Sequence, residues 1–179
     1  MKPIKLSSSS LFIICLCLIS YAVVPTLGLK LYEELCNEAR KYTHECLDYM
    51  KGDYKIVGAT NYHDLSYYIL DLAVFEAQSF QEYLVGKSKQ FPNDQALKKC
   101  AYEFLKSTVA AFESSLSKLD NNPQSSRSDA ETASLGADNC DKAIQNDQKP
   151  EFDPLPIRTH NNEMFLLSVT SSLSINHLT

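Results

Sequence analysis

Apolar residues recur at intervals of three and four along four long stretches of the chain, which is the spacing of one face of a helix. The pattern is clearest from about Asn93 to Leu119, where Pro92 precedes the stretch and Asn93 or Asp94 can cap its first turn. The apolar or small positions of this stripe are Leu97, Ala101, Phe104, Thr108, Ala111, Ser115 and Leu119. The spacing predicts a helix across the whole stretch.

Three further stretches carry the same period. The first runs from about Asn61 to Gly86, and we expect the glycine to end the helix. The second runs from about Ser128 to Gln145, where Ser128 and Glu131 have the spacing of a capping box. The third runs from about Asn161 to Leu178, after a proline-rich stretch around Leu155 that we expect to be extended.

Two shorter helical stretches precede these, from about Lys30 to Arg40 and from His44 to Met50. No alternating strand pattern of useful length is found, and we expect Asn121 to Arg127 to be a polar loop and Lys149 to Arg158 to be a proline-bearing connection. Four long helices with short links favour an all-α, up-down-up-down four-helix bundle with an N-terminal helical hairpin.

The first 28 residues have the pattern of a secretory signal peptide. Lys2 and Lys5 precede an apolar run over residues 11–19, which is long enough for the core of a signal peptide and too short for a membrane span. Small residues permit cleavage after Gly28, which we favour, or after Ala22. We therefore expect a secreted domain over residues 29–179, with the hairpin at 29–52 and the bundle at 60–179.

Charge limits the partners of this domain. The whole chain has a net charge of −5, and the leader contains two lysines and no acidic residue, so 15 basic and 22 acidic residues remain, with a net charge near −7. Nucleic-acid binding depends on clustered lysine and arginine, so no nucleic acid is expected as a partner. No second long apolar run follows the leader, so no membrane association is expected after cleavage.

The cysteines indicate disulfide bonds. Cys15 and Cys17 lie in the leader, and four cysteines remain in a chain expected to meet an oxidising compartment. These four allow three connectivities. Proximity along the chain favours Cys36–Cys46, which would clip the two short helices together and leave Cys100–Cys140 to join two later elements.

Catalytic and metal-binding motifs are absent from the sequence. It contains no nucleophile elbow, phosphate-binding loop, dinucleotide fingerprint or paired metal-ligand histidines. The histidines are spread along the chain at His44, His63, His160 and His177. We therefore expect no catalytic residue, no metal and no cofactor, and we favour a protein that acts by binding.

Two groups of side chains are candidates for binding or catalysis. Carboxylate pairs such as Glu33 with Glu34, or Asp138 with Asp141, could serve acid–base chemistry, but solvated charges on a helix face are the favoured interpretation. The tyrosines near the start of the first long helix could stack on a sugar, but packing at the helix edge is favoured. These tyrosines are Tyr62, Tyr67 and Tyr68.

Several segments together carry a resemblance to a known family. Leu35-Cys36 and Cys46-x-x-Tyr49 lie about ten residues apart, and a further forty residues separate Cys100 from Cys140. The segments 96–101, 130–140 and 161–168 add to the pattern. Over essentially the whole chain after the leader, the sequence resembles the plant invertase and pectin methylesterase inhibitor family.

The resemblance implies a fold and a mode of action. It implies a four-helix bundle with a helical hairpin extension, bridged from the first to the second cysteine and from the third to the fourth. Family members inhibit acid invertases or pectin methylesterases by forming a stoichiometric complex that blocks the substrate cleft. We therefore expect a non-enzymatic inhibitor of the apoplast, or of the vacuole, whose partner is one of these two enzymes.

The sequence departs from the family pattern at several positions. Ala39 and Thr43 replace the usual threonine and proline near the first two cysteines. Pro123, Gln124 and Ser125 stand where invertase-directed members have Pro-Lys-Phe, and we predict a target-contact loop there. The length of this polar loop leads us to lean slightly toward an invertase inhibitor. A diverged member that inhibits neither enzyme, or a carrier of a small apolar ligand, are the alternatives.

Overall fold

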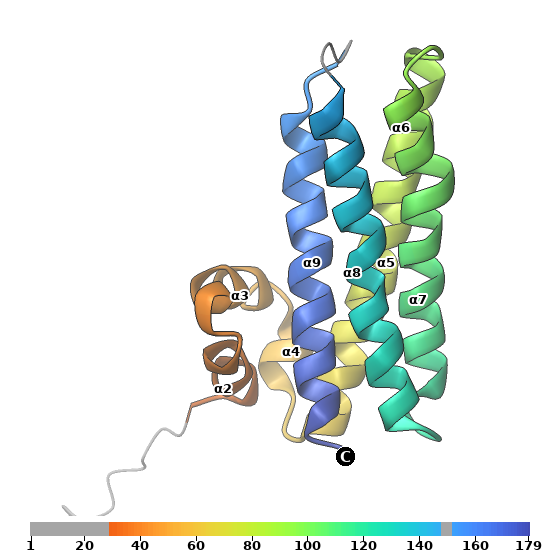
Figure 1. Ribbon diagram of the computed structural model, residues 1–179. Coiled ribbons are helices and arrows are strands. Elements are labelled where there is room, and N and C mark those ends of the chain that lie inside the picture. Colours follow the sequence, from red (N-terminus) through yellow and green to blue (C-terminus); the bar gives the residue numbers. More distant parts are fainter. Residues whose placement is uncertain (1–28, 148–151) are drawn as a thin grey trace, which may run out of the picture.

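The computed structural model describes residues 29–147 and 152–179. Four long helices run antiparallel to one another, and a helical hairpin lies against one side of them (Figure 1). The described ranges contain no strand. The predicted all-α, up-down-up-down bundle with an N-terminal hairpin is therefore confirmed. The predicted leader over residues 1–28, with its alternative cleavage sites, lies outside the described residues.

The hairpin is built from helix α2 (Leu31–Glu38), the 3₁₀ turn η1 (Arg40–Tyr42) and helix α3 (Thr43–Met50). The chain reverses between the two helices at Arg40, whose φ of 52° is a left-handed conformation. Leu35 and Met50 are fully buried, which anchors one residue of each helix in the core. Both predicted short helices are thus present: the first ends at Glu38, before the turn, and the second begins one residue earlier than predicted, at Thr43.

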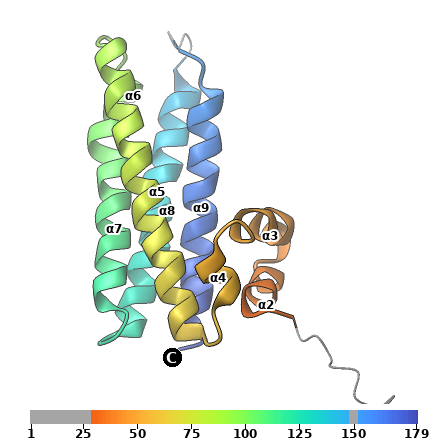
Figure 2. The same ribbon diagram turned by 180° about the vertical axis from the view of Figure 1, so that it is seen from behind.

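A short helix, α4 (Tyr54–Gly58), links the hairpin to the bundle (Figure 2). The Asp53 carboxylate caps it by accepting hydrogen bonds from the backbone amides of Lys55 and Ile56. The sequence does not predict this element, because a helix of five residues is too short to show a period.

Helix α5 (Tyr62–Gln90) is the longest of the bundle. It begins as predicted, with the Asn61 side chain accepting a hydrogen bond from the amide of Asp64. The prediction that Gly86 ends it is wrong, because the helix continues for another turn. A Cβ at Gly86 would meet nothing within 4 Å, so the glycine sits at an open surface position that the helix passes through.

The second long stretch is helical throughout but divided into three parts: α6 (Gln95–Lys99), the π-helical turn η2 (Cys100–Phe104) and α7 (Leu105–Lys118). Asp94 caps α6 by accepting a hydrogen bond from the amide of Leu97 at 2.8 Å. A π turn changes the side-chain register of a helix. The predicted helix and its cap are confirmed, whereas its regular period from end to end is not.

The last two helices each begin earlier than predicted. Helix α8 (Pro123–Asn146) starts directly after Asn122, so Asn121 to Arg127 is not a polar loop and Ser128 lies inside the helix rather than at its cap. Helix α9 (Leu155–Asn176) starts within the stretch that we expected to be extended. A proline in the first turn of a helix loses no hydrogen bond, because that amide has no partner there, and this explains both errors.

Small residues let α7, α8 and α9 approach closely. A Cβ added at Gly136 of α8 would lie 2.2 Å from the Thr108 hydroxyl oxygen and 2.3 Å from the Phe104 carbonyl oxygen, so only glycine fits there. The Thr108 hydroxyl donates to the carbonyl of Ala133 at 3.0 Å, and the Ser168 hydroxyl of α9 donates to that of Ala130 at 2.7 Å. Buried hydroxyl groups therefore bond to backbone carbonyls where α7, α8 and α9 meet. We call this contact between the three helices the seam.

Two disulfide bonds complete the fold. Cys36 pairs with Cys46 between α2 and α3, and Cys100 pairs with Cys140 between η2 and α8. This is the connectivity that proximity favoured and that the family resemblance implies. The first bridge closes a local hairpin, whereas the second joins two helices of the bundle through cysteines that are 40 residues apart along the chain.

Candidate functional site

The predicted target-contact residues Pro123, Gln124 and Ser125 form the first turn of α8 rather than a loop. The Asn122 side chain accepts a hydrogen bond from the amide of Ser125 at 3.1 Å. Gln124 is exposed, but the turn does not project from the end of the bundle as a flexible segment. That these residues contact a target stays a prediction. Any such contact would be made by a helix end and not by a loop.

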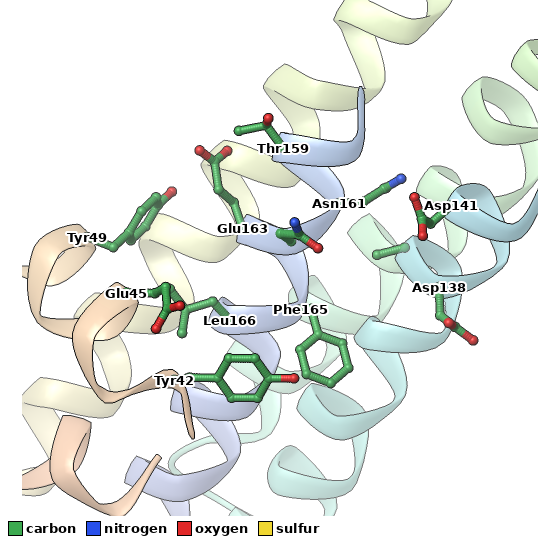
Figure 3. Close-up of a pocket in the computed structure, with 12 residues that line it drawn as sticks. Tyr42, Glu45, Tyr49, Asp138, Asp141, Thr159, Asn161, Glu163, Phe165 and Leu166 are labelled. Carbon is green, nitrogen blue, oxygen red and sulfur yellow. The ribbon is translucent and has the colours of Figure 1, made fainter. Parts of the chain in front are cut away.

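The structure instead shows a cavity of about 490 Å³ between the hairpin and the bundle (Figure 3). Helix α3 and the turn before it form one wall, α9 forms the floor and α8 forms the opposite wall. The cavity lies about 20 Å along α8 from the Pro123–Ser125 turn, since Asp138 is thirteen residues beyond Ser125 and a helix rises about 1.5 Å per residue. The two candidate sites are therefore separate.

Aromatic side chains line the cavity from two directions. The rings of Tyr42 and Phe165 meet at its lower end in Figure 3, with centroids 5.5 Å apart and planes tilted by 55°. Tyr49 stands on α3 at the upper end, near Glu163 and Thr159. The hairpin thus reaches the bundle here through aromatic rings.

Carboxylates surround the same cavity. Three of them have partners: Asp138 is paired with Lys142, Asp141 lies 3.4 Å from the Arg158 guanidinium, and Glu163 is bonded to the His160 ring at 2.8 Å. The fourth, Glu45, is exposed and forms no hydrogen bond or ion pair within the described ranges. The walls therefore carry an excess of negative charge that is partly neutralised at the rim.

A cluster of titratable groups continues behind the cavity, between α3, α5 and α9. Burial, and then the neighbouring carboxylate of Glu163, raise the pKa of Glu76, although His160 lowers it in part. Burial, and then Glu76 and Glu163, raise the pKa of the Tyr49 hydroxyl far above its usual value. Tyr49 therefore stays protonated and remains a hydrogen-bond donor.

The other candidate side chains from the sequence do not line the cavity. Glu33 accepts a hydrogen bond from the Lys30 amide at 2.9 Å and so caps α2. Tyr62 stacks on His177 with centroids 3.8 Å apart, and Tyr67 contacts Tyr68 edge to face, so the three tyrosines form no continuous platform. Glu33 and Tyr62 therefore serve the structure, and Tyr67 and Tyr68 form a local ring pair.

The carboxylates Asp138 and Asp141 do line the cavity, together with Tyr42, Tyr49 and Asn161, which the sequence analysis did not single out as site residues. Tyr49 entered it only as part of the family-like Cys46-x-x-Tyr49 pattern. Tyr42 stands in no motif, and the family-like segments that contain Tyr49 and Asn161 do not indicate that these side chains share a site. Their proximity depends on how the hairpin docks on α9.

Within the described part of the chain, no group of three or more histidine, cysteine or acidic side chains could hold a metal ion. No described helix is both long enough and apolar enough to cross a bilayer.

A second exposed surface lies on the outer face of α5, toward α7. Phe75 is 63% exposed there, and Tyr67, two turns earlier on the same face, is 45% exposed. Gln78 donates a hydrogen bond to Glu113 of α7 at 2.8 Å, which ties the two helices together beneath this face. We call this surface, with Tyr67, Phe75, Gln78 and Glu113, the α5–α7 face.

Known proteins were compared with the chain by sequence and by structure. No family model matches it, and no curated protein matches it in sequence. A solved structure does match: the crystal structure of a mutant form of a pectin methylesterase inhibitor from Arabidopsis. The TM-score is 0.66 over 79% of this chain and 93% of that chain, at 15% sequence identity. The fold is that of a pectin methylesterase inhibitor.

At this identity the match establishes the fold and supports the resemblance that the cysteine spacing indicated. Because the aligned region covers 93% of the inhibitor, the likeness extends over nearly all of that chain rather than one helix pair.

Proposed function

We propose that the chain is a secreted inhibitor of pectin methylesterase that acts by forming a stoichiometric complex with the enzyme. The observation that carries the proposal is the match to nearly the whole of a pectin methylesterase inhibitor, with the two bridges that the family resemblance implies. Inhibition by occlusion needs no catalytic residue. It needs a rigid surface, which a bundle with a disulfide bond across its helices supplies.

Pectin methylesterase is preferred to acid invertase for two reasons. The lean toward invertase depended on a long polar loop at Pro123–Ser125, and that segment is helical. The matched structure is also an inhibitor of the other enzyme. Acid invertase is therefore the second target to be tested.

The α5–α7 face is the surface that we propose meets the enzyme. Stable complexes bury about 800 Å² per partner, and large aromatic side chains supply much of the binding free energy. Phe75 has the most exposed aromatic ring of this face, at 63%. Its helix, α5, spans 29 residues and so offers an extended surface to a cleft.

Secretion is part of the proposal. The pattern of the first 28 residues and the two disulfide bonds both suit an oxidising, extracellular compartment. The apoplast is the proposed location and the vacuole is the alternative, since both hold carbohydrate-active enzymes of the proposed classes.

The test is a titration of each enzyme with protein recovered from the medium of a secreting host. We expect residual pectin methylesterase activity to fall linearly and to reach its minimum at one equivalent of the protein, with acid invertase unaffected. Size-exclusion chromatography should show the corresponding 1:1 complex. Inhibition of acid invertase alone would reverse the choice of target, and no effect on either enzyme from acidic to neutral pH would refute the proposal.

The proposed face is tested separately with two matched variants. Phe75→Ala should weaken the complex by at least 2 kcal/mol, about thirtyfold, if the ring is a central anchor. Leu135→Ala removes a similarly exposed apolar side chain from α8 and should leave the affinity unchanged. Equal effects of both variants would exclude the α5–α7 face as the contact.

A further inference from the structure

The cavity between α3, α8 and α9 contains polar groups that lack partners within the described ranges. The Tyr42 and Tyr49 hydroxyl groups, the Glu45 carboxylate and the Asn162 amide form no hydrogen bond there. The side chain of Asn161, which also lines the cavity, has neither a donor nor an acceptor for its two polar atoms among the residues described.

Asn161 is the most informative of these groups. It is 3% exposed, so water at the surface does not reach its amide. Figure 3 shows the amide directed from α9 toward the wall that carries Asp141. A buried amide can donate two hydrogen bonds and accept two, and leaving all of them unmade lowers the stability of a fold. Neither polar atom is accessible to water, so a ligand in the cavity bonds to this amide only when the side chain turns toward it.

The charges around the cavity select the kind of partner. An anionic ligand would meet Glu45 and Glu163 at the hairpin side and the carboxylates of α8 opposite. A cationic ligand gains little, because three of the carboxylates already have basic partners. The pairs are Asp138 with Lys142, Asp141 with Arg158, and Glu163 with His160. What remains are phenol and amide groups, which donate and accept hydrogen bonds, and the Glu45 carboxylate, which accepts them, and this set suits hydroxyl groups on a neutral molecule.

The aromatic lining adds a shape requirement. The tilted rings of Tyr42 and Phe165 present an apolar surface beside the polar groups. Ligand sites of about 300–1,000 Å³ combine such surfaces with a few orienting polar side chains, and this cavity is about 490 Å³. A flat carbon face with hydroxyl groups at its edge would satisfy both kinds of wall.

We infer that this cavity binds a neutral, polyhydroxylated ligand of the size of one or two sugar rings. The ring face contacts Tyr42 and Phe165, and its hydroxyl groups bond to Tyr49, Glu45 and the asparagine amides of α9. The inference is independent of the enzyme that the protein inhibits, because the cavity is lined by α3, α8 and α9 and not by the α5–α7 face.

The experiment is a titration of the isotope-labelled, secreted protein with single sugars, followed by backbone amide resonances. Sucrose and cellobiose are the neutral probes, digalacturonic acid is the anionic probe and glucosamine the cationic one. We expect at least one neutral sugar to give saturable shifts confined to α3, α9 and the facing turn of α8. Digalacturonic acid should give none at the same concentration.

Variants connect the shifts to the cavity. Tyr49→Phe removes one hydroxyl group and no packing volume, and we expect about tenfold weaker binding, the factor that corresponds to 1.4 kcal/mol. Asn162→Ala, at an exposed position that tolerates truncation, should also weaken binding. Tyr67→Phe makes the same chemical change as Tyr49→Phe on the distant face of α5 and should leave the affinity unchanged. Circular dichroism confirms that each variant is folded.

Three results would overturn the inference. The first is the absence of saturable shifts with either neutral sugar up to its solubility limit. The second is equal binding of the neutral and the anionic probes. The third is binding that neither Tyr49→Phe nor Asn162→Ala weakens, since the ligand would then occupy another place.

Discussion

The hairpin and the bundle are stabilised by different means. The hairpin is closed by a bridge between cysteines ten residues apart, and it meets the bundle through few large side chains such as Tyr42 on Phe165. The bundle is closed by a bridge across 40 residues and by small side chains that let α7, α8 and α9 touch at backbone distance. A loosely filled boundary between the two leaves room for the cavity, whereas the seam leaves none.

The largest expected effect comes from the two bridges, removed one at a time. Loop-entropy estimates give roughly 4 kcal/mol for a closed loop of 40 residues and roughly 3 kcal/mol for one of 10. We therefore expect Cys100→Ala with Cys140→Ala to lower the free energy of unfolding more than Cys36→Ala with Cys46→Ala, as measured by denaturant unfolding. The hairpin variant should retain the helicity of the bundle, and a larger loss from it would show that the bundle depends on the hairpin.

The seam is tested next, by adding one methyl group at two glycines. Gly136→Ala should cost about 1–3 kcal/mol, because its Cβ would lie within 2.3 Å of atoms of Thr108 and Phe104. Gly86→Ala should instead raise stability by up to about 1 kcal/mol, since its Cβ meets nothing within 4 Å and alanine is the better helix former. Thermal unfolding of both variants measures the difference, and effects of the same sign would contradict this account of the seam.

A smaller effect is expected at the start of α8. Asn122→Ala removes the side chain that accepts a hydrogen bond from the Ser125 amide, and it should lower the free energy of unfolding by about 1 kcal/mol. Asn121→Ala, one residue earlier and also exposed, should lower it less. Hydrogen exchange should show faster opening of the first turn in the capping variant. Unchanged exchange would mean that tertiary contacts of Ser126, whose hydroxyl group bonds to the carbonyl of Ser115 at 2.8 Å, hold the turn without the cap.

How much of this was predictable differs between the elements. The capping residue of α6 and the apolar period of α6 to α7 are signals between residues close together along the chain, and the sequence predicts both. The starts of α8 and α9 were missed although the signal was present, since Pro123 and Pro156 occupy first-turn positions that suit proline. The π turn that begins at Cys100, the residue bridged to Cys140 of α8, has no local signal.

The smallest effect concerns the boundary between the hairpin and the bundle. Burial and Glu163 raise the pKa of Glu76, so the folded protein retains this proton to higher pH than the unfolded chain does. The stability that this provides is complete below the usual pKa of a glutamate and is lost as the pH rises through the raised value. Glu76→Gln should therefore stabilise the protein at neutral pH by less than about 1 kcal/mol, because solvent screens a partly exposed group.

The gain from Glu76→Gln should vanish below about pH 4, where the wild-type carboxyl is also neutral. Glu82→Gln, at an exposed position of the same helix, is the matched control and should show no such pH dependence of the difference. Unfolding at acidic and neutral pH measures both. A gain that persists at low pH would mean that the charge of Glu76 is not its cause.

The sequence by itself determined the helical class, the presence of four long helical stretches and the start of the first one at Asn61, because periodicity and capping act over a few residues, and it limited the cap of the second to Asn93 or Asp94. It also narrowed the cysteine pairing to one preferred choice. Only the tertiary structure decided where the hairpin docks, and hence that Tyr42 and Tyr49 face Asn161 across a cavity. These residues are more than a hundred positions apart, so their proximity depends on the balance of contacts in the whole fold rather than on any local pattern.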